Sequence, residues 1–196
     1  MIRFTFNKTV FLSLILTIIC CGAFANAFTA QEKEIADLQI KRLPPTAFPI
    51  LPPKIVANLQ SRGCTIPQQH GRDPMNVVRG AFLKKHQIDW AVLCSINRAS
   101  SLLVFWGGSD ENVSEISEAY PDKAWLQGSE DGIFYERIIN VIGKKEIMEY
   151  YPCFEGRRKA PPIDHEGIED VWDGKTSSVY YYYQGKWLIG GSCNPH

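Results

Sequence analysis

Apolar residues occupy consecutive positions in two neighbouring segments near the middle of the chain, 89–95 and 101–106. Strands that are apolar at successive positions are covered on both faces, whereas half-exposed strands alternate. Residues 97–100 have the polar character of a hairpin loop between them, and residues 76–82 precede them as a further strand. The pattern predicts an antiparallel meander at the centre of a sheet.

Later segments extend this predicted sheet. Residues 132–141 are predicted to form another strand, and residues 177–183 and 186–189 form a closing hairpin about Gln184-Gly185. A glycine at the second loop position suits the positive φ of a tight hairpin turn. Residues 163–172 are acidic, and their pattern is ambiguous.

Helical patterns are shorter and weaker. Residues 31–43 carry spaced apolar positions among charges, and a second helix begins at Pro53 and ends near Gly63, a residue suited to a left-handed C-cap. Residues 144–151 predict a short helix that Pro152 ends. The elements together predict an α+β domain, with a single antiparallel β-sheet of about five to six strands and two or three helices packed on it.

The N-terminal residues 1–27 have the parts of a secretory signal peptide. Arg3 and Lys8 give a basic start, residues 10–23 are apolar, and small residues up to Ala27 form a cleavage site. Cleavage leaves enough chain for one domain with a substantial core. The sequence therefore predicts an exported protein, secreted or periplasmic.

Two other interpretations of the leader fit these residues less well. The apolar run covers about 14 residues, short of the roughly 20 that span a bilayer. A lipid-attachment site has a small residue before its cysteine, but Ile19 precedes Cys20. We therefore expect no lipid anchor and no stable membrane insertion after cleavage. An N-terminal helix and proline-rich connector are expected over 28–52, and a single α+β domain over 53–196.

The chain that remains after cleavage is close to neutral. It keeps 19 basic and 21 acidic residues, because the leader contains two basic residues and no acidic one. The lysine pairs at 84–85 and 144–145 are interpreted as ordinary solvated residues. Such a surface gives no electrostatic basis for binding nucleic acid or an anionic membrane.

Four cysteines remain after the leader: Cys64, Cys94, Cys153 and Cys193. An even number in an exported chain suggests two disulfides, with three possible pairings. We favour Cys64–Cys94 and Cys153–Cys193, because each closes a local loop, of roughly 30 and 40 residues, and the second would tie down the C-terminus. Free thiols are the alternative. A metal site is disfavoured, because the spacing is not of the zinc type.

One cluster of titratable residues has the composition of a functional site. Asp164, His165 and Glu166 place two carboxylates beside an imidazole, a combination that binds metals or transfers protons. Their spacing matches neither a zinc-protease motif nor an EF-hand loop, so no metal ligands are assigned. A solvated acidic turn before the last hairpin is the alternative interpretation.

The aromatic residues of the closing hairpin are a second candidate. The side chains of Tyr180, Tyr181, Tyr182 and Tyr183 alternate across one strand, and Trp187 lies on its partner. Tyr181 and Tyr183, if exposed beside Trp187, would stack on a sugar ring or anchor a protein partner. In the alternative interpretation, a helix or loop covers that face, or cross-strand tyrosine pairs stabilise the hairpin.

Several motifs are similar to those of a group of uncharacterised secreted bacterial proteins. The resemblance covers roughly residues 48–190 and implies a bacterial, exported protein. It implies no known activity, and therefore no catalytic residue. The motifs are RGCTIPQ at 62–68, GAF at 80–82, DWAVLC at 89–94, VFW at 104–106 and PIDHEGIE at 162–169, followed by Tyr180 and GKW at 185–187.

These features favour a binding function over catalysis. The sequence contains no nucleophile-elbow serine and no glycine-rich phosphate loop, so neither a catalytic residue nor a cofactor is expected. The first hypothesis is a non-enzymatic periplasmic or secreted domain that binds a protein or an envelope glycan. The alternative is a hydrolase or metal-dependent enzyme that uses Asp164, His165 and Glu166. A purely structural envelope component is a third hypothesis.

Overall fold

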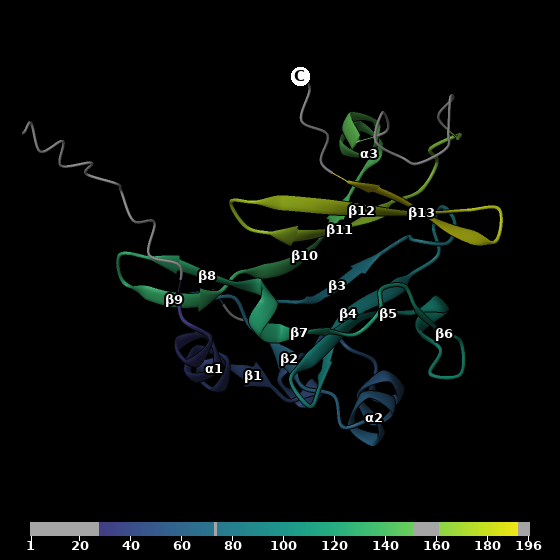
Figure 1. The fold of residues 1–196 in the computed structure, drawn as a ribbon. Coiled ribbons are helices and arrows are strands. Elements are labelled where there is room, and N and C mark those ends of the chain that lie inside the picture. The colour runs from purple at the N-terminus through teal and green to yellow at the C-terminus, as the bar shows by residue number, and fades with distance from the viewer. Residues whose placement is uncertain (1–27, 73, 151–160, 192–196) are drawn as a thin grey trace, which may run out of the picture.

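The computed structural model describes residues 28–72, 74–150 and 161–191, and within them two larger antiparallel sheets form the centre (Figure 1). None of the described helices has the length and apolar character that crossing a membrane requires. The α-helices are α1 Ala30–Gln39, α2 Pro53–Ser61 and α3 Lys144–Tyr150, and short 3-10 turns occupy Pro45–Ala47, Trp106–Gly108 and Asp122–Trp125.

The first sheet comes from the middle of the chain. Its strands follow the order β3-β4-β5-β6, and β7 also pairs with β5. The β4–β5 hairpin turns at Asn97 and Arg98, whose φ angles are 51° and 64°. β3 stands first in the strand order and pairs only with β4, so it is an edge strand. The bounds are β3 Val77–Gly80, β4 Asp89–Ile96, β5 Ala99–Phe105, β6 Val113–Glu115 and β7 Tyr120–Pro121.

The second sheet comes from the C-terminal part. Its strands follow one another in the order β10-β11-β12-β13, so β10 is an edge strand. The last hairpin turns at Gln184 and Gly185, with φ of 50° and 82°, as the glycine predicts. The bounds are β10 Arg137–Ile142, β11 Gly167–Trp172, β12 Thr176–Tyr183 and β13 Lys186–Gly191.

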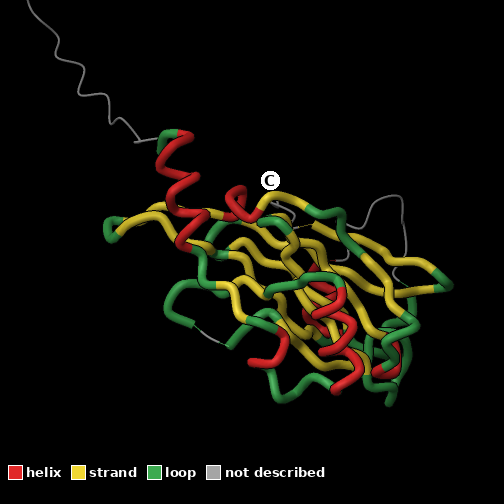
Figure 2. Tube along the Cα trace, turned by 90° about the horizontal axis from the view of Figure 1, so that it is seen from below, coloured by secondary structure: helices red, strands yellow, loops and turns green. Residues whose placement is uncertain are grey.

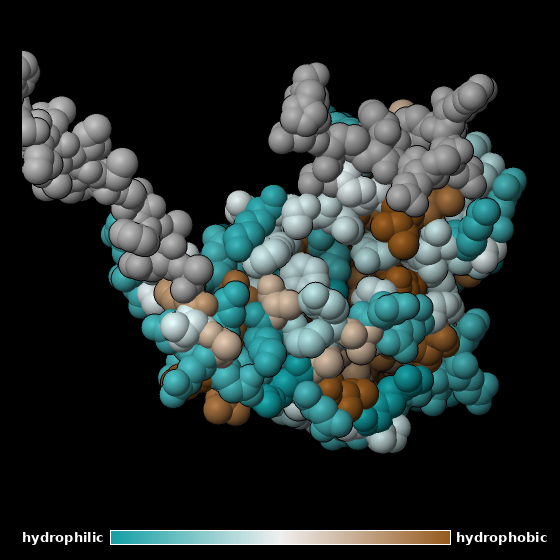
Figure 3. Space-filling model, in the orientation of Figure 1, coloured by the Kyte–Doolittle hydropathy of each residue, from teal (hydrophilic) through white to brown (hydrophobic). Residues whose placement is uncertain are grey.

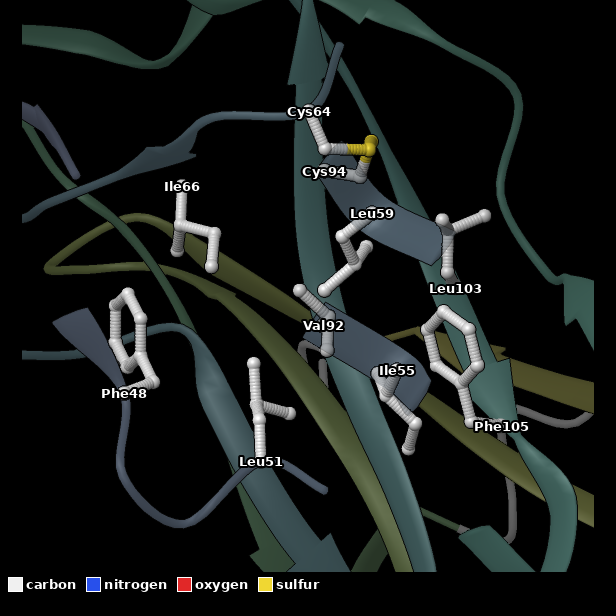
Figure 4. Close-up of a cluster of buried hydrophobic side chains, with 10 residues drawn as sticks. All are labelled: Phe48, Leu51, Ile55, Leu59, Cys64, Ile66, Val92, Cys94, Leu103 and Phe105. Carbon is white, nitrogen blue, oxygen red and sulfur yellow. A yellow bond between two sulfur atoms is a disulfide. The ribbon is translucent and has the colours of Figure 1, made fainter. Parts of the chain in front are cut away.

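The two sheets pack against each other, and a helix covers the outer face of each. Leu102 of the first sheet and Ile139 and Ile168 of the second belong to one buried cluster. α2 covers another cluster on the outer face of the first sheet, drawn in Figure 4. On the outer face of the second sheet, Ile147 of α3 packs near Tyr181. In Figure 1, α2 lies below the first sheet and α3 above the second.

The prediction of a single sheet is wrong, although the mixture of helices and antiparallel strands is confirmed. A lone sheet with helices on one face would leave an apolar face of 89–95 in water, whereas a second sheet buries it. The predicted strand 132–141 is in fact two strands, because the chain leaves one pairing at Glu136 and enters another. Figure 2, which views the molecule from below, shows strands making up most of its centre. The first of the two is β9 Gly132–Tyr135, which pairs with β8 Leu126–Ser129.

The N-terminal segment packs beside the sheets. α1 begins with a capping box, in which Thr29 Oγ1 accepts a hydrogen bond from the Glu32 amide and the Glu32 carboxylate accepts one from the Thr29 amide. Ala36 of α1 and Ile40, which follows the helix, are buried in a cluster with Tyr135 of β9. The chain then pairs β1 Arg42–Leu43 with β2 Ile66–Pro67.

The predicted disulfide between Cys64 and Cys94 is confirmed, and it ties the chain after α2 to β4 (Figure 4). Gly63 precedes it with a φ of 73°, consistent with the predicted end of α2. Cys153 and Cys193 lie outside the described residues, so the second predicted disulfide stays a prediction.

Candidate functional site

A groove of about 1140 Å³ runs along the outer edge of β3. Residues 77–81 line it without a gap, and the loop 163–166 lies across from them with the end of β10 and the start of α3. Ile50 and the loop 85–88 complete its walls. β3 and β10 are in contact, so the groove opens where the edges of the two sheets meet.

The main-chain groups of Val77 and Arg79 point toward this edge. The Leu93 amide of β4 donates to the carbonyl of Asn76 at 3.0 Å, and β3 keeps the same register with β4 along its length. Residues of an antiparallel strand alternately bond to the partner and point away from it, so Val77 and Arg79 point outward. The described part of the chain makes no hydrogen bond to the outward amide or carbonyl of either residue.

Both ends of this edge are closed by hydrogen bonds. The Gln68 side chain accepts from the Met75 amide at 2.6 Å and donates to the Met75 carbonyl at 3.1 Å. At the other end, Ala81 donates to Glu166 Oε2 at 2.7 Å, and the Glu166 amide donates to the Ala81 carbonyl at 2.9 Å. A Cβ at Gly80 would lie 3.0 Å from Glu166 Oε2, so glycine permits this close approach. Edge strands are usually covered, and here the middle is open.

Asn76, the residue before β3, joins the two sheets. Its φ is 70°, a conformation that asparagine tolerates better than most residues, and its side chain is buried. The side-chain Nδ2 donates to the Arg137 carbonyl at 3.1 Å, and Oδ1 accepts from the Ile139 amide at 3.0 Å. Asn76 thereby satisfies main-chain groups on the outer edge of β10.

Asp89 fixes the loop that forms one wall. Its carboxylate is fully buried, and Oδ2 accepts from the amides of Phe82 and Leu83 at 2.9 and 3.0 Å. Oδ1 accepts from Gln87 Nε2 at 2.6 Å and from the Gly107 amide at 2.7 Å. A buried carboxylate with four donors is a strong anchor, because each bond is charge-assisted. The loop 82–87 is therefore held from its start and its end.

The walls carry charges of both signs. Arg79, Lys85 and Lys144 are exposed cations that line the groove, and Asp164 and Glu166 line it as well. Lysine and arginine therefore outnumber aspartate and glutamate by three to two in the lining. The Glu166 carboxylate is already engaged by a main-chain amide. The groove therefore presents three exposed cations to a ligand, although the chain as a whole is neutral.

Apolar side chains lie between these charges. Ile50 and Ile88 are 47% and 43% exposed and line the groove, as do Val78 and Val141, which pack against the core between the sheets. On the face shown in Figure 3, hydrophobic surface occurs as separate patches among hydrophilic residues. The groove thus offers a ligand both apolar contacts and cations.

His165 is part of the wall rather than a free imidazole. Its Nδ1 lies 2.9 Å from the Glu166 carbonyl oxygen and its Nε2 lies 3.0 Å from that of Tyr182. The ring stacks on Tyr181 with centroids 4.4 Å apart, and only 6% of the side chain is exposed. Carbonyl oxygens therefore face both ring nitrogens, which leaves neither directed at a ligand in the groove.

The aromatic residues predicted on the closing hairpin are largely internal. Tyr181 is 1% exposed, its hydroxyl donates to the Pro162 carbonyl at 3.0 Å, and burial raises the pKa of this phenol. Tyr183 packs beside α3 in the outer cluster of the second sheet. Trp187 stacks on Trp106 with ring centroids 5.4 Å apart. The structure thus brings Tyr181 to the 162–165 loop as its support, and places Trp187 elsewhere.

The sequence analysis identified some of the residues that line the groove but did not predict its open strand edge. Asp164, His165 and Glu166 all line it, but the open edge at Val77 and Arg79 was not foreseen. The available signal was the half-polar character of residues 77–80 beside two fully apolar strands, which is typical of an edge strand.

In the ranges that the structure describes, no group of three or more histidine, cysteine, aspartate or glutamate residues is arranged to hold a metal ion. Comparisons with models of known protein families, with curated proteins and with solved structures yield no match for this chain.

Proposed function

We propose that this chain is a non-enzymatic binding domain of a bacterial cell envelope, and that its groove along β3 holds an anionic protein segment or glycan. The observation that carries the proposal is the groove itself, whose lining combines the exposed cations Arg79, Lys85 and Lys144 with apolar side chains such as Ile50 and Ile88. Mixed apolar and charged linings are common in ligand sites, where a few charges orient the ligand. The expected export would place the domain among envelope polymers, which are its candidate ligands.

The arrangement of Asp164, His165 and Glu166 supports binding over the hydrolase or metal-dependent alternative. Carbonyl oxygens face both nitrogens of His165, and the Glu166 carboxylate bonds to the Ala81 amide. A general base must reach the proton that it removes, and these contacts direct both groups into the protein. Asp164, with 73% of its side chain exposed, is the only one of the three that is mainly solvated.

The proposal is tested by measuring binding of two anionic polymers, fluorescein-labelled poly-L-glutamate and polygalacturonate, to the purified chain by fluorescence anisotropy. At least one polymer should bind, and raising the salt concentration should weaken binding because exposed charges are screened. The double variant Lys85→Glu, Lys144→Glu should lose at least about tenfold in affinity, since it reverses two groove cations.

A matched control reverses the exposed lysines Lys33 and Lys186, which do not line the groove. This variant has the same net charge as the groove variant, so it separates a local effect from a global one. The proposal is wrong if the two double variants weaken binding equally, or if the chain binds neither of these polymers nor any other anionic peptide. Cleavage of either polymer during incubation would instead support the enzymatic alternative.

A further inference from the structure

We propose that the ligand of this groove is an extended polypeptide that adds a strand to the open edge of β3. This inference rests on the proposed function and specifies its ligand class. In strand addition, main-chain hydrogen bonds supply affinity, and alternate side chains supply specificity. Val77 and Arg79 provide the free amides and carbonyls that such pairing needs.

The length of the opening is defined by the structure. Gln68 bonds to Met75 and Glu166 bonds to Ala81, so the hydrogen bonds available to an incoming strand lie between these two points. A paired strand lies about 4.8 Å from its neighbour, and residues 77–81 all line the groove. We therefore expect the ligand to be a short extended segment, held by main-chain bonds at residues 77 and 79.

The two sides of the β3 edge differ in chemistry. Val77 packs with the α2 cluster, and Arg79, on the same face, lies over the Trp90 ring at 5.8 Å. Val78 points to the opposite face, toward the core between the sheets, where Val141 also lies. Side chains of an added strand alternate between these faces. We therefore expect acidic residues on the Arg79 side and apolar residues on the Val78 side.

A second copy of this chain is a poorer occupant. Pairing β3 with β3 of another molecule would bring Arg79 of both copies together, and like charges oppose association. An anionic glycan would meet the same cations, but it has no regular series of amides and carbonyls to match residues 77 and 79. Charge complementarity together with the open main-chain groups favours an acidic polypeptide.

The test begins with a random peptide library displayed on phage and selected on the immobilised chain. The expected result is enrichment of peptides in which acidic and apolar residues alternate. One enriched peptide is then synthesised with a single N-methyl group at each position in turn. N-methylation removes an amide donor, so affinity should fall about five- to tenfold at alternate positions and change little between them.

A pair of protein variants tests the same hydrogen bonds by changing the main chain of β3 instead of the peptide. Arg79→Pro removes the outward amide and the charge, whereas Arg79→Ala removes the charge alone. Proline is accepted here without loss of a ladder bond, because this amide points away from β4. Arg79→Pro should bind the peptide about fivefold more weakly than Arg79→Ala. If Arg79→Pro does not fold, the N-methyl series alone decides.

The outcomes separate the inference from the proposed function. Strand addition is wrong if polygalacturonate binds but no peptide is enriched, or if N-methylation has no period of two; the binding function then stands. If neither polymer nor peptide binds, both proposals fall. A concentration-dependent dimer in analytical ultracentrifugation that Arg79→Pro abolishes would show that a second copy occupies the edge, and would overturn the peptide proposal.

Discussion

Asp89→Asn is the substitution that most directly tests how the groove is built. The two side chains have nearly the same shape, so the change removes charge and one acceptor without opening a cavity. In the wild type, each oxygen accepts two hydrogen bonds, at distances from 2.6 to 3.0 Å. Whichever position the new NH₂ group takes, it faces two donors whose bonds the carboxylate oxygen accepted in the wild type.

The size of the effect follows from these contacts. A hydrogen bond to a charged group contributes about 1.5–3 kcal/mol, so two lost bonds set an upper range of about 3–6 kcal/mol. The amide will take the Oδ1 position, because the Gln87 side chain can turn its own carbonyl toward it, which leaves only the Gly107 amide unpaired. The neutral amide also costs less to bury than a carboxylate. We therefore expect the free energy of unfolding to fall by about 2–3 kcal/mol.

Urea denaturation followed by tryptophan fluorescence measures this change, and the midpoint should fall with an unchanged m-value. Amide hydrogen exchange should accelerate at Gly107 and stay slow at Phe82 and Leu83, whose acceptor survives. The control is Asp131→Asn, at the exposed tip of the β8–β9 hairpin. A loss below about 0.5 kcal/mol for Asp89→Asn would refute the reasoning that this carboxylate anchors the loop.

Three further predictions concern stability. Replacing Cys64 and Cys94 together by alanine should lower the free energy of unfolding by about 3.5 kcal/mol, because the bridge spans a sequence separation of 30. Loss of the bridge also loosens the unfolded chain, so the urea m-value should rise; an unchanged m-value would contradict this. Arg137→Ala should cost about 3–5 kcal/mol in the same assay, since it leaves the Asp170 carboxylate buried and unpaired, whereas replacing both residues by apolar ones should cost much less. Hydrogen bonds from a lysine and an arginine lower the pKa of Glu34, so its contribution to holding α1 is present above the unfolded-state pKa and lost as the pH falls through the lowered value. The protection factors of the α1 amides, which correct for the pH dependence of intrinsic exchange, should therefore fall under acid, and much less so in Glu34→Gln.

The local elements were largely accessible from the sequence. Consecutive apolar residues in 89–95 and 101–106 predicted strands covered on both faces, and the structure buries both. Pro53 marked the start of α2, and Gly185 marked the last turn. These features depend on neighbouring residues alone, and local patterns therefore reveal them.

The arrangement of the sheets was not accessible in the same way. The tyrosines of β12 were considered as an exposed face, but the first sheet covers one side and α3 the other, so Tyr180 and Tyr181 are both buried. The groove depends on which strand becomes an edge and on what docks beside it. Both features depend on contacts between residues far apart in the sequence, here those of Asn76 and Glu166. The spacing of residues along the chain does not predict such contacts.

Each of the two sheets is built from one continuous part of the chain, 77–121 for the first and 137–191 for the second. Pairings within each meander join near neighbours and form quickly, whereas docking of the two halves joins distant residues and is slower. As the chain emerges from the ribosome or translocon, the first meander is complete while the second is still unmade. Until that partner arrives, Leu102 and Val104 present an uncovered apolar face, and this interval is when the nascent chain is most exposed to aggregation and most in need of a chaperone.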